Sequence, residues 1–253
     1  MSTQRLNPLE RAALSAAPES QRDRNRDLQR ERILDAARAL FASRGFDAVT
    51  MGDVAQQAGV VRATVFNHFG SKHALVEAIT ASVFDYYAGM LDQALADEHS
   101  PTPALVRALF EHMGAGIEQF HGFYREVFRE IMKIQVGLEE GSAAAHAAER
   151  TQERLTRLLA RGQQRRELSR EFDAADLECA FTSLANGTID RWLYEDTSGS
   201  LRERMRRAAE IFLGPVASAA SLAAPGQPPV FASEPIPNPA ALPLRRARTR
   251  RTS

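Results

Sequence analysis

The chain has 253 residues, of which 44% are hydrophobic and 25% charged, and its 32 basic and 32 acidic side chains give no formal net charge. This composition is typical of a globular protein of one or two domains. The zero charge argues against a protein that coats DNA nonspecifically, because such proteins are strongly basic. Any DNA affinity would have to come from a local surface.

The cysteine content and the apolar runs indicate the cellular compartment. A single cysteine, Cys179, excludes a disulfide within the chain and suits a reducing environment. No apolar run approaches the roughly 20 residues that cross a bilayer, and the first residues lack the apolar core of a secretory signal. We therefore expect a cytoplasmic protein with no membrane partner.

Residues 1–27 are predicted to form a flexible charged extension because they show no apolar periodicity. The run ESQRDRNRDLQRERI supplies Arg22, Arg24, Arg26 and Arg30, which could reach the DNA backbone or a minor groove as an arm. Acidic residues are interleaved with these arginines. Mixed charge of this kind also commonly lines a solvated extension of the first helix, and both interpretations stay open.

Two helices are expected next, and a glycine follows each of them. An apolar stripe at helical spacing from Ile33 to Phe41 predicts a helix that ends at Gly45. Thr50 and Asp53 then have the spacing of a capping box, so a short helix should begin after Thr50. Gly59 can take the left-handed conformation that a tight turn between helices requires.

A second short helix is expected to begin near Arg62, with Val65 and Phe69 facing the core. This placement leaves an outward face made by Arg62, Ala63, Thr64, Phe66, Asn67 and His68. Two short helices around such a turn are the layout of a helix-turn-helix, whose second helix enters a major groove. Ser71 is then expected to cap a long helix that carries Leu75, Ile79, Val83 and Tyr87.

The remainder, as far as residue 213, is predicted to be one helix after another, so the fold class is all-α. Thr102 and Pro103 are expected to cap and open a helix towards residue 120. Further helices are expected over the aromatic cluster 123–132, from about Ala143, after Asp173 as a cap, and over about 201–212. Residues 214–253 hold eight of the twelve prolines and are predicted to be a disordered tail.

The tail ends with five arginines, Arg245, Arg246, Arg248, Arg250 and Arg251. They could add nonspecific attraction to phosphates. Arginine dominates the whole chain, however, and this bias is a sufficient alternative explanation.

The run ILDAARALFASRGFDAVTMGDVAQQAGVVRATVFNHFGSKHALVEAI resembles the DNA-binding head of the tetracycline-repressor (TetR) family of bacterial transcription regulators. The resemblance covers roughly residues 29–80 and rests on A-x-x-L-F-x-x-x-G-F, VT, VA-x-x-AGV, T-V-F-x-H-F and S-K-x-A-L in combination. It implies an all-α homodimer: an N-terminal three-helix helix-turn-helix head, joined by a long fourth helix to a C-terminal helical body for ligand binding and dimerisation. The implied domains are the extension 1–27, the DNA-binding head 28–75, the body 76–213 and the tail 214–253.

The resemblance and the outward face together predict the DNA-binding residues Thr50, Arg62, Ala63, Thr64, Asn67, His68 and Lys72. Family members usually contact phosphate from the positions of Thr50 and Thr64, and Lys72 would add a contact from the start of the fourth helix. Hydroxyl and ammonium groups bond phosphate oxygens, whereas Arg62, Ala63 and Asn67 are better suited to base edges. Thr50 could instead serve only as a helix cap, and Lys72 could be a solvated lysine.

Three residues depart from the family pattern. Val61 replaces the Ser or Thr that usually caps the recognition helix, Phe66 replaces a Tyr that often reaches phosphate, and His73 replaces an acidic residue. Each hydrogen bond to a charged group is worth about 1.5 to 3 kcal/mol. We therefore expect the phosphate contacts to be redistributed, with the N-terminal extension as a candidate supplier.

The segment LLARGQQRRELSREFDAADLECAFTSLANGTIDRWL is similar to the family's C-terminal region, whose last two helices pair with those of a second subunit. The dimer contacts implied by this similarity are Phe181, Leu184, Gly187 and Trp192. Burial of Trp192 within one subunit is the alternative. A dimer should meet half-sites about 34 to 36 Å apart on a near-palindromic operator.

The effector pocket is expected among helices 4 to 8 of the family's scheme. Its predicted lining is Phe84, Tyr87, Leu91, Met113, Ile117, Phe120, Tyr124, Phe128 and Met132. Such an aromatic and methionine stripe is more often plain core. As a pocket it would favour a hydrophobic or aromatic effector over a sugar or phosphate.

The sequence does not favour an enzyme. It has no phosphate-cradling glycine loop, His-Glu-x-x-His, paired cysteines or nucleophile elbow, and we expect no cofactor and no metal site. The predicted function is a ligand-responsive repressor that is released from its operator by a small hydrophobic effector. Repression rests on family habit alone. The alternative is a helical small-molecule-binding protein with weakened or lost DNA binding.

Overall fold

The computed structural model describes residues 21–135, 137, 140–195, 198–219 and 231. In these residues the named elements are all helices, and the predicted all-α class is confirmed. They are α2 (Gln21–Arg44), α3 (Met51–Ala58), α4 (Arg62–Phe69), α5 (Lys72–Ala96), α6 (Thr102–Gln119), α7 (His121–Gln135), α8 (Ala143–Gln164), α9 (Ala174–Tyr194) and α10 (Leu201–Val216). None of the described helices has the length and apolarity needed to cross a membrane.

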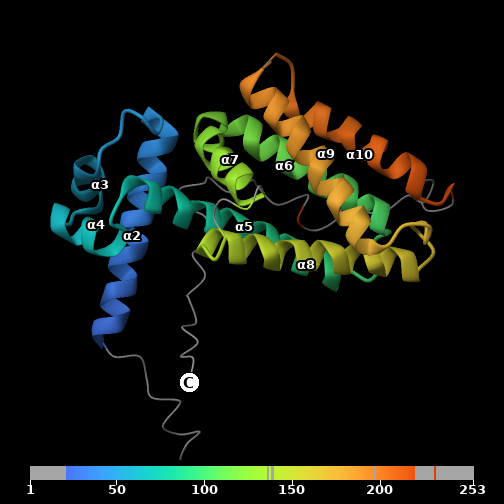
Figure 1. Ribbon diagram of the computed structural model, residues 1–253, viewed down its shortest axis with the longest axis horizontal. Coiled ribbons are helices and arrows are strands. Elements are labelled where there is room, and N and C mark those ends of the chain that lie inside the picture. The colour runs from blue at the N-terminus through green and yellow to red at the C-terminus, as the bar shows by residue number, and fades with distance from the viewer. Residues whose placement is uncertain (1–20, 136, 138–139, 196–197, 220–230, 232–253) are drawn as a thin grey trace, which may run out of the picture.

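Helices α2, α3 and α4 form a small head at one end of the molecule, together with the start of α5 (Figure 1). The apolar stripe of α2 faces inward and meets the buried faces of the two short helices. The buried residues that form this part of the core include Ile33, Leu34, Ala37, Phe41, Val54, Ala58, Val65, Phe69 and Leu75. Burial of this stripe explains why two eight-residue helices, too short to be stable alone, persist here.

The 25-residue helix α5 leaves the head and runs into the body, where α8 lies alongside it (Figure 1). Helices α6, α9 and α10 form the opposite side of the body, and α6 packs along α10. The α6 backbone comes so close to α10 that a Cβ at Gly114 would lie 2.9 Å from the Arg202 Cα. Helix α7 packs against both α2 and α5, so it contacts the head as well as the body.

Three local expectations are corrected by the structure. Helix α2 begins at Gln21, so residues 21–27 belong to a helix, as the solvated-extension alternative has it. Helix α6 has Pro101 at its N-cap, and Thr102 is its first helical residue. Helix α10 continues to Val216, with Pro215 inside its last turn. Most of the expected tail and residues 1–20 lie outside the described residues, including the five arginines near the C-terminus.

Candidate functional site

The first helix of the helix-turn-helix is held by the predicted capping box. The Asp53 backbone N–H donates to Thr50 Oγ1 over 3.1 Å, and Asp53 Oδ2 accepts from the Thr50 backbone N–H over 2.8 Å. At the other end Gly59 has a φ of +66°, in the left-handed region that favours glycine. Arg32 Nη2 donates to the Ala58 carbonyl over 2.9 Å. This bond satisfies one of the carbonyl groups that have no partner within the last turn of α3.

The second helix, α4, begins without a side-chain cap. Val61 is its N-cap and makes no capping hydrogen bond, as its missing hydroxyl predicts. The side of α4 away from the core has two exposed apolar residues, Val61 at 70% and Phe66 at 40% exposure. The guanidinium carbon of Arg62 lies 5.3 Å from the centroid of the Phe66 ring, within cation–π range. The outward face therefore combines apolar and cationic groups.

The predicted DNA-binding residues lie together on the head. Arg62, Ala63 and Asn67 are exposed, whereas Thr64 and His68 at the flank of α4 are half-buried. Lys72, in the first turn of α5, has its ammonium 4.0 Å from the centre of the Phe46 ring. This contact limits the freedom of a flexible side chain before any DNA is bound.

Thr50 is exposed, but its hydroxyl is already occupied. Thr50 Oγ1 donates to Asp53 Oδ2 over 2.6 Å and accepts from the Asp53 backbone N–H. The hydroxyl therefore serves the cap, and a phosphate contact would require its proton to turn away from Asp53. The Thr50 backbone N–H is also engaged in the cap.

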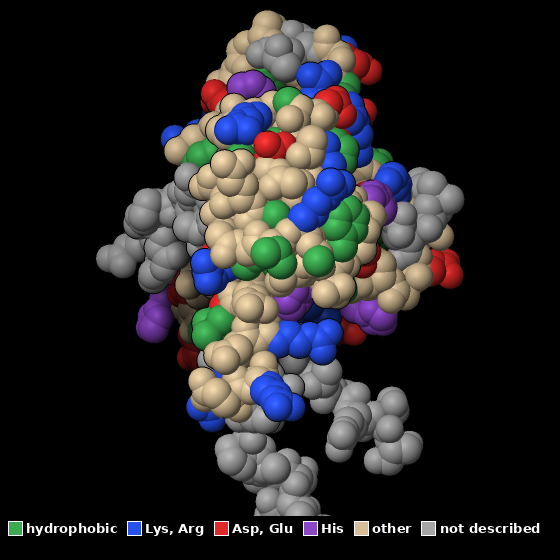
Figure 2. Space-filling view, turned by 90° about the vertical axis from the view of Figure 1, so that its left-hand side faces the viewer, with side chains coloured by type: hydrophobic (Ala, Val, Ile, Leu, Met, Phe, Trp, Pro, Cys, Tyr) green, Lys and Arg blue, Asp and Glu red, His purple; other side chains and the backbone are tan. Residues whose placement is uncertain are grey.

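The N-terminal turns of α2 lie close to the end of the recognition helix. The Arg30 guanidinium carbon is 5.1 Å from the centroid of the Phe69 ring. Partial burial and the nearby charges of Arg26 and Arg30 lower the pKa of His68, which favours the neutral imidazole. Figure 2 shows this end of the molecule, with Lys and Arg side chains above, beside and below a central group of hydrophobic side chains.

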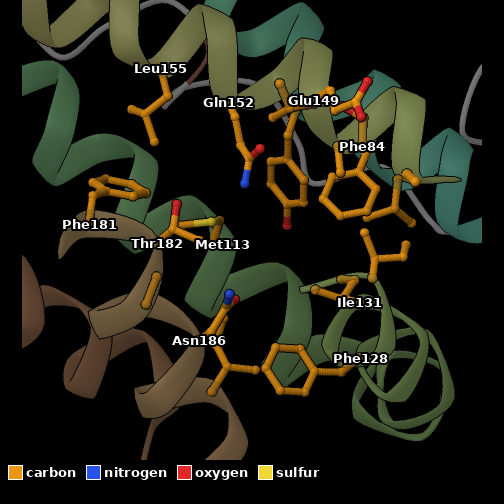
Figure 3. Close-up of a pocket in the computed structure, with 18 of the residues that line it drawn as sticks. Phe84, Met113, Phe128, Ile131, Glu149, Gln152, Leu155, Phe181, Thr182 and Asn186 are labelled. Carbon is orange, nitrogen blue, oxygen red and sulfur yellow. Dashed lines mark hydrogen bonds between the residues drawn. The ribbon is translucent and has the colours of Figure 1, made fainter. Parts of the chain in front are cut away.

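The body contains a cavity of about 660 Å³. Four helices contribute most of its apolar wall: α5, α6, α7 and α8, with α9 closing one side. Figure 3 shows Phe84, Phe128 and Ile131 on one side of it and Leu155 and Phe181 on the other, with Met113 drawn beside Thr182. A cavity of this size falls within the usual range of small-molecule sites.

Seven of the nine predicted pocket residues line this cavity: Phe84, Tyr87, Leu91, Met113, Ile117, Tyr124 and Phe128. Phe120 and Met132 do not line it and pack against the core instead. Phe120 is the C-cap of α6, and its backbone is not helical. Its side chain therefore does not continue the helix face that carries Met113 and Ile117. Met132 is one residue beyond Ile131, which rotates it about 100° away from the cavity.

The sequence did not indicate the polar part of the wall. Glu149, Gln152, Thr182 and Asn186 come from α8 and α9 and lie around the same cavity in Figure 3. A lone polar residue on an amphipathic helix looks like any solvated position until the helices are packed. The sequence held one weak indication of a cavity beside α8. The helix opens with a run of alanines, whose small side chains leave space next to them.

Two tyrosines in the cavity wall interact with each other. Tyr87 and Tyr124 are hydrogen-bonded through their side chains, and burial raises the pKa of both phenols above the usual range. Both phenols are therefore neutral at physiological pH. Their hydroxyl groups add to the polar part of the wall.

The head is fixed to α5 close to the cavity. Arg38, fully buried in α2, donates to Ser82 Oγ over 2.6 Å and to Asp35 Oδ1 over 3.1 Å. Ser82 directly precedes Val83 and Phe84 of the cavity wall. A second link joins α7 to the first turn of α5, where His73 Nε2 lies 3.5 Å from Oε1 of the buried Glu130.

The four predicted dimer residues fall into two groups. Phe181 and Trp192 are buried within the chain. The Phe181 ring makes a tilted contact with Phe110 and an edge-on contact with Phe212, and Trp192 Nε1 donates to the Gly199 carbonyl over 3.1 Å. Leu184 is half-buried and Gly187 is exposed, with no atom within 4 Å of the position a Cβ would take. Gly187 therefore lies on a face of α9 that nothing in the described chain covers.

Residues 33–79 match the model of the family described as "Bacterial regulatory proteins, tetR family". The HTH-type transcriptional regulator AlkX of Mycobacterium tuberculosis is 32% identical over 102 residues, 40% of this chain and 44% of that protein. The HTH-type transcriptional repressor KstR2 of Mycolicibacterium smegmatis is 33% identical over 93 residues, 37% of this chain and 45% of that protein. The chain thus matches less than half the length of these curated relatives.

Solved structures share the fold over most of the chain. PfmR, a TetR-family regulator of Thermus thermophilus, is 26% identical with a TM-score of 0.53, over 72% of this chain and 97% of that one. SmeT, the repressor of a multidrug efflux pump of Stenotrophomonas maltophilia, has a TM-score of 0.60 at 21% identity, over 82% and 97% of the two chains.

The fold and the head define an all-α protein with an N-terminal helix-turn-helix. Together with the head motifs, the family match and the named relatives show a head of the TetR family over residues 33–79, and the solved structures share the fold of the body. The names of these relatives are those of transcriptional regulators rather than enzymes.

Proposed function

We propose that this protein is a transcriptional repressor that binds a near-palindromic operator as a homodimer and leaves it when a small hydrophobic effector enters the cavity. One observation carries the proposal: a single helix, α5, has Lys72 at the DNA-reading head and Phe84, Tyr87 and Leu91 in the cavity wall. The distance along the helix from Lys72 to Tyr87 is about 22 Å at 1.5 Å per residue. A ligand that shifts α5 would therefore move the head.

The Arg38–Ser82 hydrogen bond supports this coupling. Because Arg38 is fully buried, its guanidinium cannot exchange Ser82 for water without a rearrangement of the head against α5. A displacement of α5 next to Phe84 is thus passed to α2 as well as along α5 itself. An effector coupling of about 1 to 3 kcal/mol would lower DNA affinity roughly 5- to 150-fold.

The test is fluorescence anisotropy of the full chain on its own upstream intergenic DNA, at fixed salt, against a scrambled competitor. We expect a specific complex that Lys72→Ala and Asn67→Ala each weaken about tenfold, since each removes a hydrogen-bonding group from the head. Matched controls are Arg157→Ala for the charge and Gln93→Ala for the amide, both at exposed sites of the body. These controls should bind DNA as the parent protein does.

Effector action is tested by the same assay in the presence of cavity ligands. Specific binding that a cavity ligand releases would support the whole proposal. Binding of the ligand without any specific DNA complex, on this fragment or on genomic fragments, would instead favour the alternative: a small-molecule-binding protein whose head has lost function. Val61 and Phe66 are the residues that motivate that alternative, because they remove a cap and a hydroxyl from the recognition helix.

A further inference from the structure

The charges on the cavity wall are all of one sign among the described residues. Three glutamates line it, Glu140, Glu149 and Glu178, and no Lys, Arg or His is found among the described lining residues. Glu178 accepts a hydrogen bond from Thr182 Oγ1 over 2.7 Å. In Figure 3 Glu149 lies beside Phe84.

The arginines of α8 that lie nearest in sequence to Glu149 are paired elsewhere. Arg150 Nη2 is 2.9 Å from Asp85 Oδ1, and Arg154 Nε is 2.8 Å from Asp92 Oδ1, both on α5. These pairs tie α8 to α5 and use the positive charges of both arginines. These two arginines therefore have their carboxylate partners on α5 rather than in the cavity wall.

The wall also contains five aromatic side chains. Phe84, Tyr87, Tyr124, Phe128 and Phe181 come from three different helices, α5, α7 and α9, and surround the same space. The faces of such rings carry negative partial charge and attract cations. The Tyr87 and Tyr124 phenols stay neutral, because burial raises their pKa, and so they can offer only hydrogen bonds and ring faces.

We propose that the cavity binds a lipophilic cation: a molecule whose apolar or aromatic body fills the space and whose positive charge lies near Glu149 and Glu178. The cavity itself is the site, and the carboxylates decide the sign of the charge it accepts. A desolvated anion in the same place would meet carboxylates and ring faces, with only neutral donors such as the Gln152 and Asn186 amides to bond it. This inference rests on the proposed function only in taking the cavity as the effector site.

The effect of charge can be separated from size and shape with tetraphenylphosphonium and tetraphenylborate, which are matched in shape and opposite in sign. Isothermal titration of the full chain should show the cation binding at least tenfold more tightly than the anion. Glu149→Gln and Glu178→Gln should each weaken cation binding about three- to tenfold, and the double variant more. Neither change should weaken binding of the anion.

Glu153→Gln, at an exposed position of α8 outside the cavity wall, is the matched control and should leave both affinities unchanged. Thermal unfolding of each variant reports whether it is folded. Binding of the anion as tightly as the cation, or indifference of cation binding to both glutamine variants in folded protein, would overturn the inference. Cation binding that leaves the DNA complex intact would refute the effector mechanism and leave the ligand class standing.

Discussion

Phe66 shows how one side chain can redistribute the contacts of a recognition helix. Its ring is 40% exposed on α4, at a position where the family often has a hydroxyl, and Arg62 lies over it. We predict that Phe66→Tyr raises operator affinity about two- to tenfold, because an added hydroxyl bond to phosphate contributes about 0.5 to 1.5 kcal/mol net. Anisotropy titration at fixed salt measures the change.

The matched control for this change is Phe172→Tyr, which adds the same hydroxyl to a ring that is 46% exposed just before α9. It should leave DNA affinity unaltered. If Phe66→Tyr lowers affinity or has no effect, the ring does not face the phosphate backbone, and its role is confined to holding Arg62.

Residues of the head were predictable because their chemistry is local. Thr50, Asp53 and Gly59 act within ten residues of each other, so spacing alone indicated the cap and the left-handed turn, and the structure has both. Arg38 was not predictable in this way. Its partner Ser82 is 44 positions away, and nothing in the sequence marks that arginine as buried.

At the scale of elements, the close packing of α6 on α10 depends on one missing methyl group. A Cβ at Gly114 would lie 2.9 Å from both the Arg202 Cα and the Met205 Cγ. We predict that Gly114→Ala destabilises the protein by about 1 to 3 kcal/mol, because the α10 backbone cannot yield as a side chain can. Chemical denaturation monitored by circular dichroism measures the loss.

Gly89→Ala is the control for the helical substitution itself. Gly89 is exposed on α5 with nothing within 4 Å of a Cβ, so alanine there should stabilise by up to about 1 kcal/mol through helix propensity. Equal stabilisation by both changes would mean that α10 moves freely away from α6, and the close approach would have no structural role.

Element boundaries followed the same division between local and distant causes. The starts of α3, α5, α8 and α9 coincide with side-chain caps at Thr50, Ser71, Ser142 and Asp173, and three of these caps were read from the sequence. The end of α10 was not, because Pro215 signals a break in sequence but can occupy the last turn of this helix. The cavity, built by five helices, was foreseen only along the stripes of α5, α6 and α7, where apolar periodicity is visible.

At the scale of the whole molecule, charge balance and helix arrangement are connected. The chain is neutral overall. Exposed arginines of α2 and α4 nevertheless lie at the head, whereas arginines of the body such as Arg150 and Arg154 pair with acidic residues of α5. A single head with a local positive surface would have limited affinity for DNA. Two heads on one rigid particle would combine their contacts, so specific binding in this proposal depends on the dimer.

The uncovered face of α9 is where the proposed dimer can be tested most directly. Gly187 is exposed, and a side chain there meets open space within the described chain, so Gly187→Arg should fold normally. If a second copy packs on this face, the arginine places an unpaired charge in the interface. We predict a monomer in sedimentation velocity and a large loss of operator affinity, with thermal stability lowered only by the lost association. Gly89→Arg, at the exposed glycine of α5, should remain dimeric; a dimer that persists in Gly187→Arg would place the subunit interface elsewhere on the body.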